Sequence, residues 1–132
     1  MNPPVTEFVL DASALLALIK DEPGAEAVIA VLPRAVISAV NLSEVIAKLC
    51  DFGLSEEETR EALGVMNLEV AAFDESLAYI AGELHRSTRR KGLSLGDRAC
   101  LALAKQTGLP ALTTDRAWAG LDIGVEVRMI RD

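Results

Sequence analysis

The sequence predicts an α/β fold with a central, mostly parallel β-sheet that is flanked by helices on both faces. Short apolar segments rich in strand-forming residues alternate with longer helix-forming segments along the whole chain. This alternation favours a parallel sheet that is covered on both faces. With 132 residues, no internal repeat and no linker-like segment, the chain is expected to form a single domain over residues 1–132.

Turn and capping residues divide the chain into these elements. Gly53 and Gly108 are suited to helix ends, while Ser55 with Glu58 forms a capping-box pattern and Asp74 is suited to a helix N-cap. Asn41 is expected to open the helix that follows it. The predicted strands are 5–10, 35–39, 68–73, 111–114 and 125–130, and the predicted helices are 12–19, 25–32, 42–52, 55–66, 74–90, 97–106 and 115–118.

Composition excludes several classes of protein. Hydrophobic residues make up 51% of the chain, which argues against disorder, and no apolar run approaches the roughly 20 residues of a membrane span. The N-terminus lacks a basic, signal-like start, so we expect a cytoplasmic protein without a membrane partner. Cys50 and Cys100 lack metal-ligand spacing and are expected to be reduced thiols buried in the core.

Charge is distributed unevenly along the chain. The net charge of −7 argues against binding nucleic acid through bulk charge. Residues 51–85 carry nine acids against Arg60, whereas residues 86–105 carry six basic residues against Asp97. The basic segment fits either a solvated helix face or a local phosphate-binding surface. It contains Arg86, Arg89, Arg90, Lys91, Arg98 and Lys105.

Four acids are expected at the carboxyl edge of the sheet, where open α/β sheets bind their ligands. Asp11 and Asp115 directly follow strands, Glu44 lies early in the next helix, and Asp97 starts another helix. Ten helical residues rise about 15 Å and five extended residues return about 16 Å, which brings Asp97 and Asp115 to the same end.

Each of these acids could singly be a helix cap, and Asn41–Glu44 and Ser94–Asp97 both fit capping boxes. Four carboxylates together would repel one another unless a cation neutralised them. Oxygen ligands without His or Cys suit Mg²⁺ or Mn²⁺, which can activate water and stabilise a phosphodiester transition state.

The four acidic motifs, in this order, resemble those of the PIN domain, and most closely those of the VapC toxins of toxin–antitoxin pairs. The motifs are VLDASALLAL around Asp11, NLSEV around Glu44, LSLGDRACLALA around Asp97 and LTTDRAW around Asp115. The resemblance covers essentially the whole chain. It implies a PIN-like fold and a Mg²⁺- or Mn²⁺-dependent endoribonuclease that acts on structured RNA such as transfer RNA. It also implies a homodimer that is silenced by a VapB-like antitoxin.

On this basis Asp11, Glu44, Asp97 and Asp115 are the expected catalytic and metal-binding residues, with Asp11 and Asp97 as the firmest direct ligands. Ser13, Asn41 and Thr114 could support these acids through hydrogen bonds, although helix-terminal roles would also explain them. The expected RNA contacts are Arg86, Arg89, Arg90, Lys91, Arg98 and Arg116. Arg98 and Arg116 each follow an acid directly, so a role in organising the acids fits them equally well.

Other α/β classes lack their defining residues here. A haloacid-dehalogenase-type phosphatase would carry a second Asp at the position of Ser13, and a dinucleotide-binding domain would carry a glycine-rich turn after the first strand. A response-regulator receiver would need an acidic pair near the end of the first strand and a lysine near the last strand. The remaining alternative is a non-catalytic PIN-like module that binds RNA or protein. Because all four acids are present, the sequence favours the enzyme.

Overall fold

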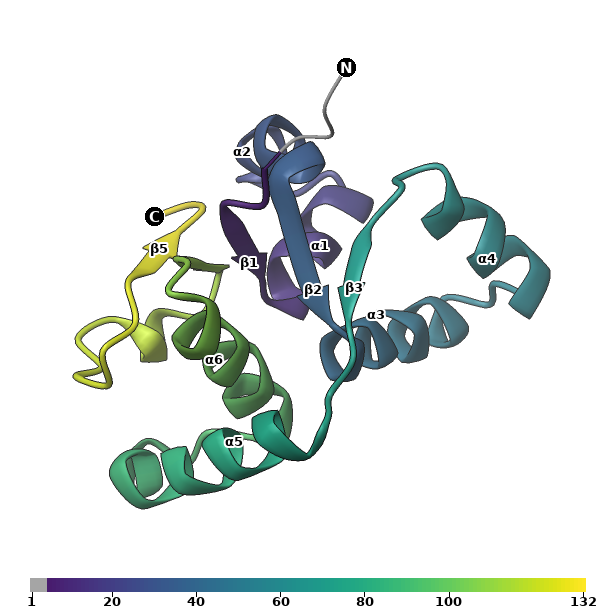
Figure 1. The fold of residues 1–132 in the computed structure, drawn as a ribbon. Helices are drawn as coiled ribbons and strands as arrows, with labels where there is room; N and C mark the ends of the chain where they lie inside the picture. Colours follow the sequence, from purple (N-terminus) through teal and green to yellow (C-terminus); the bar gives the residue numbers. More distant parts are fainter. Residues whose placement is uncertain (1–4) are drawn as a thin grey trace.

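The computed structural model describes residues 5–132, and within them five strands form one parallel sheet in the order β3-β2-β1-β4-β5 (Figure 1). This confirms the predicted α/β fold. The chain runs from β1 outward to β3, returns to the other side of β1, and runs outward again to β5. The strands are β1 (Phe8–Leu10), β2 (Ala35–Ser38), β3 (Glu69–Ala71), β4 (Ala111–Thr113) and β5 (Val127–Met129).

Six α-helices and three short 3₁₀ helices lie between and beside the strands within the described residues. The α-helices are α1 (Ala12–Ile19), α2 (Ala25–Val31), α3 (Ala39–Asp51), α4 (Glu56–Gly64), α5 (Glu75–Thr88) and α6 (Leu95–Thr107). The 3₁₀ helices are η1 (Leu32–Arg34), η2 (Arg89–Lys91) and η3 (Arg116–Trp118). Each predicted strand and helix is therefore present, with shifts of a few residues at its ends.

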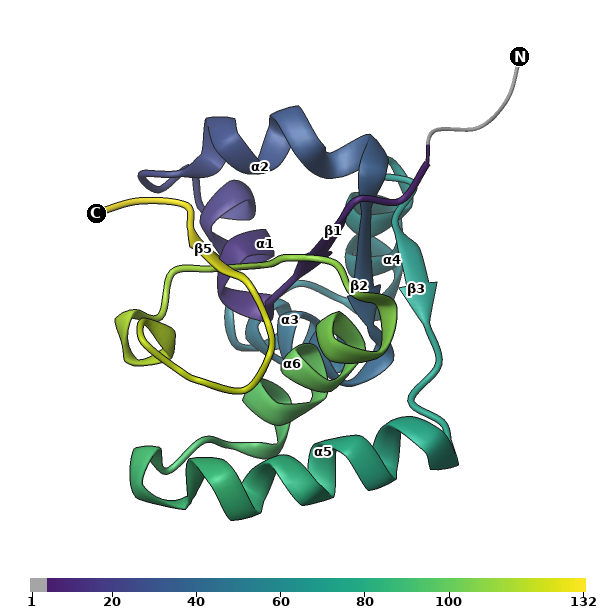
Figure 2. The same cartoon turned by 60° about the vertical axis from the view of Figure 1, so that its left-hand side comes forward.

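Side-chain alternation along the central strands divides the core between the two faces of the sheet. Val9 and Val36 pack in the cluster that includes Leu101 and Leu103 of α6 and Leu84 of α5. The intervening residues Leu10 and Ile37 pack against α1, α2 and α3 on the opposite face. Helix α5 lies outside α6, as the two views show (Figures 1 and 2).

Helix α3 begins three residues earlier than the sequence predicted. The Ser38 hydroxyl accepts a hydrogen bond from the backbone N–H of Val40 and caps the helix, which starts at Ala39. Asn41 therefore lies inside the first turn, fully buried, and Glu44 lies in the second turn. The expected Asn41–Glu44 capping box is wrong, whereas the capping boxes at Ser55–Glu58 and Ser94–Asp97 are confirmed.

Helix α4 stands at the β3 edge of the sheet, next to α3 (Figure 1). A groove of about 640 Å³ lies between these elements. Its lining includes Leu42 and Ile46 of α3, Leu63 of α4 and Val70 of β3. Cys50 also lines the groove and is exposed, so the expectation that it is a core thiol is wrong, while Cys100 is buried as expected.

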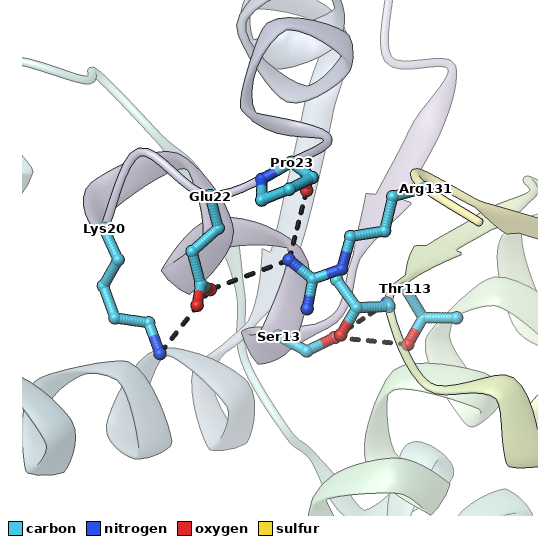
Figure 3. Close-up of polar contacts among 7 residues, drawn as sticks. Ser13, Lys20, Glu22, Pro23, Thr113 and Arg131 are labelled. Carbon is cyan, nitrogen blue, oxygen red and sulfur yellow. Dashed lines mark hydrogen bonds and ion pairs between the residues drawn. The ribbon is translucent and has the colours of Figure 1, made fainter.

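The C-terminus is attached to the turn between α1 and α2. Arg131 Nη1 donates a hydrogen bond to the carbonyl oxygen of Pro23 at 3.1 Å and lies 3.8 Å from the Glu22 carboxylate (Figure 3). Within residues 5–132, no helix combines the length and apolar character needed to cross a membrane.

Candidate active site

The sheet has its switch point at β1, where the direction of the strand order reverses. The chain passes from β1 to β2 and β3 on one side, and then returns from β3 to β4 on the other side of β1. This is the point at which open parallel sheets bind ligands. Asp11 directly follows β1 there and is only 5% exposed. Asp11 therefore lies at the carboxyl edge of the sheet, as the sequence predicted, between the two halves of the sheet.

Hydrogen bonds fix the Asp11 carboxylate. Its Oδ2 accepts from the Ser13 hydroxyl at 2.7 Å and from the Thr113 hydroxyl at 2.9 Å. The two hydroxyl oxygens are 3.2 Å apart (Figure 3). Within the described residues, the Asp11 side chain makes no capping hydrogen bond at the start of α1. Helix capping alone therefore does not explain this acid.

Thr113 was not predicted from the sequence as a site residue, and its neighbour Thr114 was predicted instead. The register pairs Leu10 with Leu112, so the next residues along the two strands, Asp11 and Thr113, lie side by side. Thr113 is fully buried, and its hydroxyl also accepts the backbone N–H of Asp115 at 3.0 Å. Thr114 takes part through its backbone N–H, which donates to the Ser13 hydroxyl at 3.0 Å.

The electrostatics of Asp11 reflect its burial. The pKa of its carboxyl group is raised from 3.8 to about 6, and removal from water is the largest cause, with a smaller upward contribution from the negative charge of Asp97. The hydrogen bonds from Ser13 and Thr113 oppose this shift. A carboxyl group that is costly to ionise, in a crevice, is typical of a functional site.

Asp97 lies near Asp11, because its charge raises the pKa of the Asp11 carboxyl group, and Glu44 lies against Gly96, the residue before Asp97. Burial raises the pKa of the Cys100 thiol in α6, and the charges of Asp11, Asp97 and Glu44 raise it further. The charges of all three carboxylates therefore act on the same residue of α6. Asp97 also closes a capping box, because its Oδ2 accepts the backbone N–H of Ser94 at 3.0 Å. Both roles that the sequence suggested for Asp97, cap and cluster member, are thus compatible.

Glu44 is exposed on α3 and accepts a hydrogen bond from Asn41, a residue of the same helix that also contacts α6. Asn41 Nδ2 donates to Glu44 Oε1 at 2.9 Å and to the carbonyl oxygen of Gly96 at 2.9 Å. Asn41 was expected either to support Glu44 through a hydrogen bond or to cap the helix, and the structure has the hydrogen bond to Glu44. Gly96, in the first turn of α6, was not singled out as a site residue from the sequence.

Asp115 is placed differently from the other three acids. It is half-buried, and its Oδ1 accepts the backbone N–H of Ala117, which caps η3. Its link to Asp11 runs through Thr113, whose hydroxyl contacts both residues. Asp115 therefore borders the Asp11 cluster from the end of β4.

Four basic side chains gather where α5 ends. A hollow of about 420 Å³ is lined by Arg86, Ser87, Arg89, Arg90 and Lys91. Arg86 also pairs with Glu83 at 3.2 Å. Arg98 is placed elsewhere, because its Nη1 donates to the carbonyl oxygen of Ala81 at 3.0 Å and joins α6 to α5. Arg116 is exposed on η3, next to Asp115.

The carboxylates suit a hard divalent cation by their chemistry, since all the available ligand atoms are oxygens. Among residues 5–132, no group of three or more His, Cys, Asp and Glu side chains is already arranged to hold a metal ion. Mg²⁺ commonly binds through only one or two carboxylates and keeps several of its waters. The burial of Asp11 beside the charge of Asp97 fits such a cation, which would favour the ionised form of both.

Comparison with known proteins agrees with this geometry. The sequence profile of the PIN domain matches residues 8–123. The DNA-bound VapBC structure from Salmonella typhimurium has a TM-score of 0.74 and 22% identity, covering 96% of this chain and 99% of that chain. A toxin–antitoxin complex from Klebsiella pneumoniae has a TM-score of 0.73 and 20% identity, covering 94% and 98%.

A third similar structure, FitAcB from Neisseria gonorrhoeae, has a TM-score of 0.69 and 21% identity, covering 91% of this chain and 95% of that chain. At these identities the likeness is one of fold. A search of curated proteins found no significant match.

Proposed function

Because the chain belongs to the PIN domain family, we propose that it is a metal-dependent endoribonuclease of the VapC type, the toxin of a toxin–antitoxin pair. The observation that supports this most strongly is the buried Asp11 carboxylate at the switch point of the sheet, with Asp97 and Glu44 nearby. Acids at the carboxyl edge of a parallel sheet, without His or Cys, favour phosphodiester hydrolysis assisted by Mg²⁺ or Mn²⁺.

Asp11 and Asp97 would hold the cation directly, because their charges already act on each other. When bound, the cation supplies an activated water and charge stabilisation for the phosphodiester transition state. Glu44 and Asp115 would orient water molecules at the edges of the cluster. Ser13 and Thr113 hold the Asp11 carboxylate in place, as the hydrogen-bonded partners of metal-binding carboxylates generally do.

The basic residues that line the hollow at the end of α5 would contact RNA phosphates. Arg89, Arg90 and Lys91 lie on η2, which a short loop connects to Ser94 and α6. Arg116 lies beside Asp115 and would add a contact from the other side of the crevice. Arg98 is left out of this set, because its guanidinium group joins α6 to α5. Transfer RNA is the structured RNA to test first.

The groove between α3, α4 and β3 would bind a segment of a VapB-like antitoxin. Similar structures were solved as VapBC or toxin–antitoxin complexes. The groove presents Leu42, Ile46 and Leu63, while α4 carries Glu56, Glu57, Glu58 and Glu61. An amphipathic segment with apolar side chains and flanking Lys or Arg would match both features. The sequence around α4 offers four apolar residues for such a contact, Leu54, Leu63, Val65 and Met66. Val65 is 81% exposed and Leu63 lines the groove, while Leu54, Leu63 and Met66 all pack against the core.

A homodimer acting in the cytoplasm completes the proposal. Light scattering of the purified protein would test the dimer, and a monomer at all concentrations would contradict that part. A non-catalytic PIN-like module remains the alternative, and it would bind RNA or the antitoxin without cleaving RNA.

The deciding experiment incubates purified protein with transfer RNA, with Mg²⁺, with Mn²⁺ or with a chelator, alongside Asp97→Asn. We expect cleavage only with metal, by the wild type and by the control variant but not by Asp97→Asn. Asp74→Asn is the matched control, because Asp74 is an exposed N-cap on α5 and asparagine caps equally well. Cleavage that persists in chelator or in Asp97→Asn would contradict the proposal. Binding of RNA without cleavage would favour the non-catalytic module.

A further inference from the structure

The buried carboxamide of Asn41 connects the two halves of the acidic cluster. Both distances from its Nδ2, to Glu44 Oε1 and to the carbonyl oxygen of Gly96, are 2.9 Å. An amide nitrogen carries two protons, so the two acceptors use both. Glu44 lies one turn later on α3, whereas Gly96 lies 55 residues away, in the first turn of α6. One side chain thereby fixes the Glu44 carboxylate relative to α6.

Gly96 provides the space in which that carboxylate lies. A Cβ atom at this position would be 2.4 Å from both carboxylate oxygens of Glu44. Real Cβ atoms essentially never approach other atoms so closely. The Gly96 backbone is not in the left-handed region, so a larger residue here would be opposed by the Glu44 side chain, whose end would have to move, and not by backbone conformation. Glu44 therefore lies against the residue that precedes Asp97.

The orientation of the Asn41 amide follows from its two acceptors. If the amide were turned over, Oδ1 would face a carboxylate oxygen and a carbonyl oxygen, which both repel it. In the observed orientation, Oδ1 is buried without a hydrogen-bond partner among the described residues. Leaving a buried acceptor unpaired is unfavourable. Asn41 is therefore better suited to holding Glu44 than to stabilising α3 by itself.

We propose that Asn41 is a positioning residue for this site, which holds the Glu44 carboxylate in the space left by Gly96, beside Asp97. This proposal rests on the proposed metal-dependent function. Asn41 touches neither the cation nor the RNA. It acts through Glu44, whose charge it keeps close to Asp11 and Asp97, and it thereby raises the affinity of the cluster for a divalent cation.

The test measures Mn²⁺ binding by calorimetry without RNA, and separately the thermal unfolding of the metal-free protein and RNA cleavage at saturating Mn²⁺. Asn41→Leu removes both donors at similar volume, and Gly96→Ala displaces the Glu44 carboxylate. Each should weaken Mn²⁺ binding by about 10- to 100-fold, as loss of a partner that orients a metal ligand typically does. Asn41→Thr keeps one donor and should recover part of the affinity.

The control for Gly96→Ala is Gly82→Ala. Gly82 lies within α5, and a Cβ there would meet nothing within 4 Å. This variant should bind Mn²⁺ as the wild type does. The effects of Asn41→Leu and Gly96→Ala on Mn²⁺ binding should not add, because both changes displace the same carboxylate. The double variant should therefore have the same affinity for Mn²⁺ as the single variant that binds it less tightly.

Two outcomes separate this inference from the proposed function. If the wild type binds Mn²⁺ and cleaves RNA, and the Asn41 and Gly96 variants bind Mn²⁺ equally well with only their melting temperatures changed, the positioning role is wrong. If the wild type neither binds Mn²⁺ nor cleaves RNA, the proposed function fails and this inference fails with it. Should Asn41→Leu fail to fold, Asn41→Thr and Gly96→Ala decide the question by the same Mn²⁺ titration.

Discussion

Asp11 and Asp115 each come just after a strand at the same edge of the sheet, yet the structure holds their carboxylates in different ways. Asp11 is 5% exposed and is bonded by the hydroxyl groups of Ser13 and Thr113. Asp115 is half-buried and caps η3 through the backbone N–H of Ala117. Strand β1 lies between β2 and β4, so its end is covered from both sides, whereas β4 lies one strand closer to the edge. The place of a strand in the sheet decides how strongly the acid that follows it is desolvated.

Replacing each acid by asparagine should give the largest difference between the two positions. Asp11→Asn removes a proposed direct metal ligand, so we expect RNA cleavage to fall by about 100- to 1000-fold, equivalent to about 3–4 kcal/mol of lost transition-state stabilisation. Asp115→Asn keeps the cap of η3, and its rate of RNA cleavage should fall by only about tenfold. Initial cleavage rates at saturating Mg²⁺ test this, and equal losses would contradict the distinction.

The second-largest effect concerns the pH dependence of stability, which should change when Asp11 is replaced. The folded-state pKa of Asp11, about 6, lies above its usual value of 3.8, so folding favours the protonated form. The stability that this provides is full below pH 3.8 and is lost as the pH rises through 6. The free energy of unfolding of metal-free Asp11→Asn should therefore rise, relative to that of the wild type, by up to about 3 kcal/mol between pH 4 and pH 7.

Chemical unfolding of both proteins at several pH values measures this difference. The difference in the free energy of unfolding between wild type and Asp11→Asn should change steadily between pH 4 and pH 7. If the free energies of unfolding of wild type and Asp11→Asn differed by the same amount at every pH, burial of the Asp11 charge would not be the cause of the difference.

Divalent cations should stabilise the wild type through the same cluster. At a Mg²⁺ or Mn²⁺ concentration 100 times the dissociation constant, the free energy of unfolding should rise by about 2.7 kcal/mol. Asp11→Asn should show no such rise at that concentration, and Asp115→Asn a smaller rise than the wild type. Unfolding monitored with and without metal tests this. Stabilisation of Asp11→Asn to the wild-type extent would place the cation elsewhere.

Thr113→Val should have the smallest of these effects, and it tests the hydrogen bonds by which Thr113 connects Asp11 to Asp115. It removes the hydroxyl that donates to Asp11 and accepts from the backbone of Asp115, at nearly constant volume. We expect a loss of about 1–2 kcal/mol in the free energy of unfolding. Thr114→Val is the matched control, since Thr114 contacts Ser13 through its backbone, and it should change stability by less than about 0.5 kcal/mol. Equal losses would contradict the assignment.

The sequence predicted the order of strands and helices because hydrophobic segments and capping residues agree along most of the chain. It placed the start of α3 wrongly because Ser38 and Asn41 are both good N-cap residues, and only burial of Asn41 beside Gly96 decides between them. For the same reason it could not separate Thr113 from Thr114, since the choice depends on the register of β1 with β4.

The candidate site shows the same limit. The four acids were found because they occupy recognisable positions after strands or at helix starts. Their different surroundings depend on neighbours that are remote in sequence, such as Thr113 for Asp11, 102 residues away. The position of Arg98 against Ala81 also depends on how α5 packs on α6, which charge patterning does not encode.

The two cysteines differ in a way that gives the groove a chemical reporter. Cys50 is exposed and lines the groove beside Ile46 and Leu63, while Cys100 is enclosed in the core. A thiol-specific dye added to the folded protein should therefore attach at Cys50 alone. Its attachment rate would fall whenever a bound segment covers the groove, so occupancy could be followed by modification kinetics without any engineered label.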